Sequence, residues 1–120
     1  MTPDAIVVFA HGARDPEWAR PIEKLAALIA ERAPAARVRC AYLELMRPSL
    51  PEAIDALVGE GVRTVRIVPA FIGAGGHLKR DLPTAIDALR AAHPQLQIEL
   101  APHIGESDAA LAAIADVFAR

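Results

Sequence analysis

Four short apolar runs alternate along the chain with four segments of helical periodicity, and this alternation limits the possible folds more than any other feature. The first run, residues 5–10, is an unbroken series of apolar and β-branched side chains, which is typical of a strand covered on both faces. Similar runs follow at residues 38–45, 64–71 and 96–100. Strands that alternate with helices pair in parallel through right-handed crossovers. We therefore predict an α/β fold, a four-stranded parallel sheet in βαβαβαβα order with helices on both faces.

Each segment between or after the strands carries a helix signal. Trp18, Ile22, Leu25 and Ile29 recur at steps of four, three and four, which places them on one helical stripe. The other three helices are predicted from residues that can cap or open a helix, which are Ser49 with Glu52 as a capping box, Asp81 with Pro83 in the first turn, and Ser107 or Asp108. Residues 1–120 are expected to form a single domain, because a chain of this length buries one core.

Composition excludes several classes of function. The net charge of −2 gives no basic excess of the kind that nucleic-acid binding requires. No apolar stretch approaches the roughly 20 residues that a membrane span needs. The single cysteine, Cys40, forms no internal disulfide, and the first residues lack the basic and apolar regions of a signal peptide. We expect a cytoplasmic protein without nucleic-acid or membrane partners.

Residues with metal-binding chemistry lie where the predicted strands end. His11 follows the first strand, Glu44 ends the second, His77 follows the third and His103 follows the fourth. The carboxyl ends of parallel strands share one edge of a sheet, where ligands bind. Imidazoles with a carboxylate suit Co²⁺, Ni²⁺, Fe²⁺ or Zn²⁺ and not Mg²⁺ or Ca²⁺, which prefer oxygen ligands. We predict a transition-metal site at His11 and His77, although any single loop histidine could instead bond a backbone carbonyl, and His103 is left open between the site and the surface.

The remaining polar residues of these loops have two interpretations each. Glu44 lies in an apolar run, where an unpaired carboxylate is costly, so it is either functional or paired with Arg47. His93 ends a helix and is interpreted as structural. A glycine-rich loop before the third helix is either a hinge or a place where backbone N–H groups approach an anion, and it lacks the pattern of a nucleotide-binding loop. The candidate contacts for an anionic substrate are Arg14, Arg47, Gly75, Gly76, Lys79 and Arg80, although each charge could also be ordinary solvated surface.

Three segments, residues 9–15, 42–50 and 68–77, resemble the small sirohydrochlorin cobaltochelatases of the class II, ATP-independent group. The resemblance runs through Pro83 and implies a half-chelatase domain that inserts Co²⁺ into sirohydrochlorin for cobalamin, with Fe²⁺ for sirohaem or Ni²⁺ as variants and no nucleotide. It implies metal-handling roles for His11 and His77, a catalytic carboxylate at Glu44, and a homodimer closed over the tetrapyrrole. The family often has Ser at the position of Ala13 and a second His at the position of Leu78.

Two other functions share part of this pattern. Histidine phosphatases have Arg-His-Gly after a first strand, but Ala10 stands here in place of that arginine, which removes the phosphate clamp. A non-catalytic carrier of metal or tetrapyrrole would use the same groups as a chelatase. Turnover separates these two possibilities.

Overall fold

The predicted sheet is present in the computed structural model, which describes residues 2–120 with the exception of the side chain of His77. Its strands are β1 (Ala5–Ala10), β2 (Arg37–Tyr42), β3 (Thr64–Pro69) and β4 (Gln97–Leu100). They pair in parallel in the order β2-β1-β3-β4. The predicted fold class is confirmed, and β1 is buried along its whole length as its sequence indicated.

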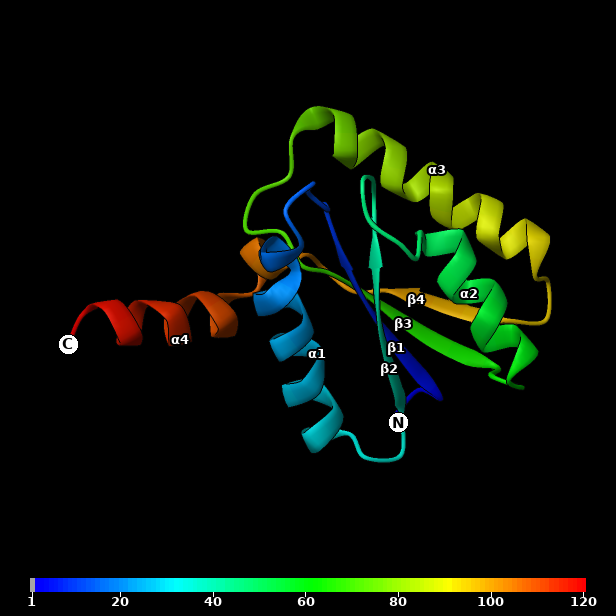
Figure 1. Cartoon of the computed structure of the whole chain (residues 1–120), viewed down its shortest axis with the longest axis horizontal. Coiled ribbons are helices and arrows are strands. Elements are labelled where there is room, and N and C mark those ends of the chain that lie inside the picture. The colour runs from blue at the N-terminus through cyan, green and yellow to red at the C-terminus, as the bar shows by residue number, and fades with distance from the viewer. Residues whose placement is uncertain (1) are drawn as a thin grey trace.

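Helices cover the sheet unequally (Figure 1). Helix α1 (Arg20–Arg32), preceded by the 3₁₀ turn η1 (Pro16–Ala19), packs on β1 and β2 on one side, whereas α2 (Leu50–Gly59) and α3 (Gly76–Ala92) lie on the other side. A second 3₁₀ turn, η2 (Ile104–Glu106), leads to α4 (Asp108–Phe118), which projects away from the sheet. None of the helices within residues 2–120 is both long and apolar enough to cross a membrane.

The main core lies between the sheet and the pair α2 and α3. Ile54, Leu57, Ile67 and Ile86 are completely or almost completely buried there. A smaller apolar cluster around Ala19 and Tyr42 lies on the α1 side. The core thus fixes β1 and β3 at the centre of the sheet, and their carboxyl ends carry the candidate site.

Two strands end earlier than predicted. The second strand ends at Tyr42 and not at residue 45, because residues 43–48 bend and Leu45 has a positive φ of 64°. The third ends at Pro69 and not at residue 71. Proline supplies no N–H to a sheet. Pro69 pairs with Phe9 of β1, and the pairing of β3 with β4 ends two residues earlier, at Ile67. Its terminal position allows a proline in a central strand.

The predicted start of the third helix is wrong. Helix α3 begins at Gly76 with Gly75 as its N-cap, so Asp81 and Pro83 lie inside the helix and do not open it. Proline has no N–H, so Pro83 cannot donate to the carbonyl of Lys79 in the preceding turn. The starts of α2 and α4 are confirmed, since Ser49 and Glu52 form the capping box and the Ser107 side chain accepts the N–H of Ala110. In the first helical segment, Trp18 lies in η1 and only the later residues of the predicted stripe lie in α1.

Candidate functional site

The backbone brings His11 and Glu44 together at the carboxyl edge of the sheet. Beyond the last paired residues of β1 and β2, the N–H of Leu43 donates to the carbonyl of Ala10 at 2.9 Å, and the N–H of Glu44 donates to that of His11 at 3.1 Å. The two side chains then meet, with His11 Nε2 3.1 Å from Glu44 Oε1. Both side chains are about half exposed, at 55% each. The predicted neighbourhood of these two residues is therefore present, and it is open to a ligand.

Gly12 permits this close approach. Its φ is 95°, a conformation that side chains rarely adopt, and a Cβ atom built on it would lie 1.9 Å from the carbonyl oxygen of Glu44. Any residue larger than glycine would push the chain after β1 away from the chain after β2. Gly12 was missed as a determinant of the site from the sequence, although a glycine directly after a strand-terminal histidine was the available signal.

The His11–Glu44 contact defines which ring nitrogen is free. A carboxylate only accepts hydrogen bonds, so Nε2 of a neutral His11 carries the proton and donates to Glu44. The lone pair of His11 then resides on Nδ1. A carboxylate that holds the far nitrogen of an imidazole is the usual support for a metal-binding histidine, because it fixes the ring and raises its basicity.

His77 lies in the first turn of α3, but its side chain is outside the described residues. Its backbone position differs from the loop that the sequence indicated, since Gly76 and His77 belong to the helix. Among the side chains that the structure describes, no group of three or more histidine, cysteine or acidic residues gathers as a metal site. The partnership of His77 with His11 therefore stays a prediction.

His103 has a structural role. Its Nδ1 lies 3.2 Å from the carbonyl oxygen of Phe71, and its Nε2 lies 2.8 Å from Glu106 Oε1. Only 16% of the side chain is exposed. Both ring nitrogens thus lie within hydrogen-bond distance of an oxygen of the protein. The described contacts of His103 therefore tie η2 to the loop after β3.

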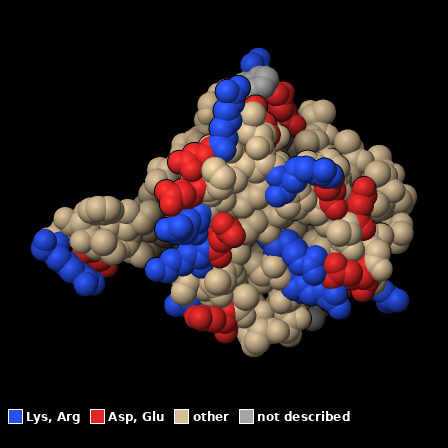
Figure 2. Space-filling model, viewed as in Figure 1, with Lys and Arg blue, Asp and Glu red and all other residues tan. Residues whose placement is uncertain are grey.

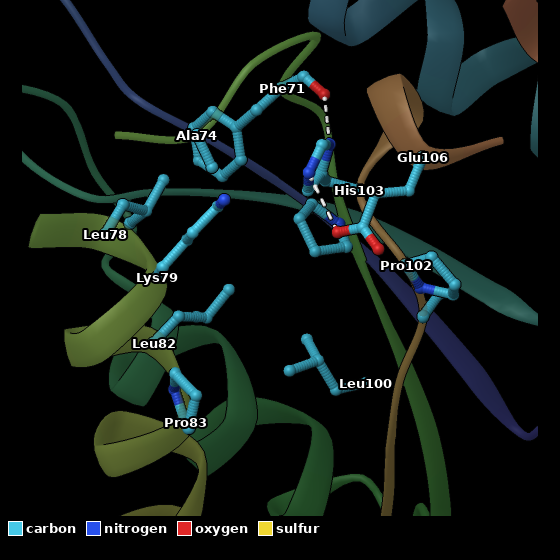
Figure 3. Close-up of a pocket in the computed structure, with 12 residues that line it drawn as sticks. Phe71, Ala74, Leu78, Lys79, Leu82, Pro83, Leu100, Pro102, His103 and Glu106 are labelled. Carbon is cyan, nitrogen blue, oxygen red and sulfur yellow. Dashed lines mark hydrogen bonds and ion pairs between the residues drawn. The ribbon is translucent and has the colours of Figure 1, made fainter. Parts of the chain in front are cut away.

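A cavity of about 290 Å³ lies between η2 and the first half of α3. Figure 3 shows Phe71, Leu82 and Leu100 on its walls and the side chain of Lys79 extending into it. Leu78 also lines this cavity, at a position where the small sirohydrochlorin cobaltochelatases often have a histidine. The lining is mostly apolar, with Lys79 and the His103–Glu106 pair as its ionisable groups, and the cavity adjoins the loop that follows β3.

Arg47 has a partner other than Glu44. Its guanidinium bonds both carboxylate oxygens of Glu52, with Nε 3.3 Å from Oε1, so the alternative pairing of Arg47 with Glu44 is wrong. This guanidinium, helped by the N–H of Ser49, lowers the pKa of Glu52 to about 2. Arg47 thus supports the start of α2.

Three other candidate cations are exposed at this edge. The side chains of Arg14, Lys79 and Arg80 have no hydrogen-bond or ion-pair partner within the described part of the chain. Nothing lies within 4 Å of where a Cβ of Gly75 or Gly76 would be, so the N-terminus of α3 is also open. Unpaired cations and a free helix N-terminus favour an anionic ligand.

His93 and Cys40 lie away from this edge. His93 ends α3 and its Nε2 is 2.9 Å from Asp55 Oδ1, in agreement with a structural interpretation. Cys40 is half-buried in β2, and burial raises the pKa of its thiol.

The whole arrangement matches one family. The model of the family described as CbiX matches residues 5–120. The chain belongs to the CbiX family. Among solved structures, a cobalamin (vitamin B12) biosynthesis CbiX protein from Marinobacter aquaeolei VT8 has 38% sequence identity and a TM-score of 0.85, with 98% of this chain and 95% of that chain covered.

Curated CbiX relatives are longer than this chain. A sirohydrochlorin cobaltochelatase of Methanococcus aeolicus is 34% identical over 80 residues, which are 67% of this chain and 56% of that protein. One from Methanopyrus kandleri is 34% identical over 66% of this chain and 55% of its own length. The matched part thus spans little more than half of these relatives. The fold is also shared with a cobalt complex of the Bacillus subtilis chelatase SirB, at a TM-score of 0.75 and 23% identity over 98% of this chain and 50% of that chain.

Proposed function

We propose that this CbiX chain inserts a divalent metal ion, Co²⁺, into sirohydrochlorin on the way to cobalamin. The observation that carries the proposal is the exposed His11–Glu44 pair at the open edge of a CbiX sheet. The cobaltochelatase names of the relatives support Co²⁺, and Fe²⁺ or Ni²⁺ suits the same imidazole chemistry.

Insertion of a divalent ion releases two protons from pyrrole nitrogens while the ion loses its water ligands. His11 Nδ1 has the lone pair that binds the incoming ion or accepts a proton, because Nε2–H is held by Glu44. His77, in the first turn of α3, is proposed as the second metal-handling group. No nucleotide takes part in these steps.

Substitution of Glu44 separates its two possible roles. If Glu44 only orients His11, Glu44→Gln should keep most of the activity, because the amide oxygen still accepts the Nε2–H bond, whereas Glu44→Ala should lose about 10- to 100-fold. If Glu44 also accepts a pyrrole proton, Glu44→Gln should lose much of the activity as well, because an amide cannot accept that proton. The measurement is kcat/KM for Co²⁺ insertion across a pH series, and wild-type activity in Glu44→Ala would contradict both roles.

The unpaired cations supply the proposed basis for substrate choice. Sirohydrochlorin carries eight carboxylates, and Arg14, Lys79 and Arg80 are free to bind some of them. Protoporphyrin, with two carboxylates, would satisfy fewer of these cations. The chain should therefore favour the tetrapyrrole with more carboxylates.

Neutralising Lys79 should weaken substrate binding more than the chemical step. Each partly exposed contact contributes about 1 kcal/mol and is screened by salt, so Lys79→Gln should raise KM for sirohydrochlorin several-fold at low ionic strength with a smaller change in kcat. Lys24→Gln, on the exposed surface of α1, is the matched control. Equal use of sirohydrochlorin and protoporphyrin by the wild type at low salt would contradict the electrostatic basis.

The proposed active form is a homodimer. A tetrapyrrole on the edge of one four-stranded sheet would leave much of its surface in water, whereas small-molecule sites usually bury most of their ligand. The chain covers half of the Bacillus subtilis SirB chain with the same fold, so a second copy would supply an equivalent half.

A further inference from the structure

Leu45 has an unusual backbone conformation for its residue type. Its φ is 64°, and among the described residues it is the only one other than glycine with a positive φ. The N–H of Met46 donates to the carbonyl of Glu44 at 2.8 Å, so Leu45 is the central residue of a γ-turn. A γ-turn with a positive central φ is rare and strained, because the side chain crowds its own backbone. The fold thus holds a leucine where glycine or asparagine would cost less free energy.

The side chain of Leu45 gains no packing in return for this strain. It is 59% exposed and belongs to neither of the two described apolar clusters. The next side chain, Met46, packs in the smaller cluster with Tyr42 and anchors the turn. Strained residues that a fold maintains cluster at functional positions. Because Leu45 directly follows Glu44, a function of its side chain belongs to the candidate site.

Ile72 is a second exposed apolar residue at this edge. It lies in the loop after β3 and is 68% exposed. Its backbone is nevertheless closely packed, since a Cβ atom on Gly105 would lie 1.5 Å from the carbonyl oxygen of Ile72. The carbonyl oxygen of Glu44, just before Leu45, lies against Gly12 in the same way. Both exposed side chains therefore extend from backbone that tertiary contacts hold in place.

Leu45 and Ile72 lie on opposite sides of the segment that carries His11. In the strand order β2-β1-β3-β4, the chain after β1 lies between the chains after β2 and β3. The pairing continues past the end of β2, where the N–H of Glu44 donates to the carbonyl of His11 at 3.1 Å. Strands two places apart in a sheet are about 10 Å apart. The edge thus offers two apolar contacts, one on each side of His11.

Charge alone does not position a tetrapyrrole on this chain. Figure 2 shows basic and acidic side chains interspersed over most of the visible face. The carboxylates of a tetrapyrrole lie on its rim, so cations can hold the rim, whereas the faces of the ring are apolar. A favourable contact with the ring itself is therefore apolar. Such a contact on each side of His11 would hold the centre of the ring, where the metal ion enters, over the imidazole.

We propose that Leu45 and Ile72 contact the apolar ring of the tetrapyrrole and centre it over His11, and that the strained turn is retained because it places Leu45 in this contact. The inference rests on the proposed function, since it takes sirohydrochlorin as the ligand, but it concerns binding of the ring and not metal insertion. It predicts opposite effects of one substitution. Relief of the strain at Leu45 should stabilise the fold and weaken binding.

Substitutions of Leu45 and Ile72 test the contact. Leu45→Gly relieves the strain and should raise the midpoint of thermal unfolding by about 2–4 °C. Its Kd for metal-free sirohydrochlorin should rise about 4- to 12-fold, because the exposed half of a leucine side chain is lost from the contact. Leu45→Asn keeps the size of the side chain and tolerates a positive φ, so it should weaken binding without making the turn flexible. Leu45→Met should bind nearly as the wild type does, and Ile72→Asn should weaken binding with little change in the midpoint.

Fluorescence titration of metal-free sirohydrochlorin gives the Kd, and circular dichroism gives the midpoint. Leu28→Asn, which replaces a leucine of 39% exposure in the second half of α1, is the matched control and should leave the Kd unchanged. A wild-type Kd in Leu45→Gly and Leu45→Asn, or a lower midpoint in Leu45→Gly, would overturn the proposal.

Light scattering distinguishes a ring contact from a contact between copies of the chain. The Leu45 variants should keep the mass of the wild type, and weaker binding together with a smaller mass would overturn the proposal by assigning Leu45 to a contact between copies. The inference and the proposed function also fail separately. Binding that depends on Leu45 in a chain that inserts no metal would refute only the chelatase activity, whereas normal insertion with unchanged Kd values in the variants would refute only the ring contact.

Discussion

Replacing His11 by alanine should lower kcat/KM for Co²⁺ insertion by on the order of 100-fold or more, while the midpoint of thermal unfolding stays close to that of the wild type. The imidazole is half exposed in the loop after β1, and its one described side-chain contact is with Glu44. Its removal eliminates the lone pair on Nδ1 but leaves the core intact. The measurements are the initial rate of the absorbance change of sirohydrochlorin and thermal unfolding followed by circular dichroism.

His93→Ala is the matched control. It removes a histidine that bonds Asp55 at the C-terminal end of α3, the opposite end of this helix from Gly76 and His77. This variant should keep wild-type activity and lose about 1 kcal/mol of unfolding free energy with its hydrogen bond. Wild-type turnover in His11→Ala would mean that His11 has no part in metal handling.

Gly12→Ala should destabilise the protein by about 3 kcal/mol and lower its activity. The new Cβ would lie 1.9 Å from the carbonyl oxygen of Glu44, and the φ of 95° is itself unfavourable for alanine. Relief of the clash would move the loop after β1 away from Glu44 and lengthen the His11–Glu44 contact. Chemical denaturation measures the stability loss, and kcat/KM measures the damage to the site.

Gly61→Ala separates strain from clash. Gly61 also has a positive φ, of 89°, but nothing lies within 4 Å of its Cβ position. Its substitution should cost only about 1–2 kcal/mol, the ordinary penalty for a left-handed residue, and should leave activity unchanged. Equal losses of stability in the two variants would show that the close approach of Gly12 to Glu44 adds nothing to the cost of the positive φ.

The sheet could be predicted from the sequence because each apolar run is followed by a segment with its own helix signal. The unbroken apolar run of β1 and the capping box at Ser49 and Glu52 are local patterns with one structural solution each. Strand topology then followed from the alternation with helices. The edge position of His11 and Glu44 followed in turn from the parallel sheet.

Features that depend on tertiary contacts could not be predicted in this way. The pairing of Arg47 with Glu52 in place of Glu44 depends on how the chain bends after β2. The two acceptors around His103 come from Phe71 and Glu106, which only the fold brings together. The start of α3 at Gly76 was missed because Asp81 and Pro83 resemble a helix start that packing overrides. The outward direction of α4 also has no local signal, since an apolar helix predicts burial without specifying the covering surface.

The most direct test of the proposed activity is the number of metal ions inserted per chain when sirohydrochlorin and Co²⁺ are in large excess over the protein, under anaerobic conditions. We expect many equivalents of cobalt-sirohydrochlorin per chain, formed faster than in buffer alone, and a rate that depends on His11. A conversion that stops at one equivalent would identify a carrier of metal or tetrapyrrole. A rate equal to that of spontaneous insertion would contradict the proposed chelatase activity.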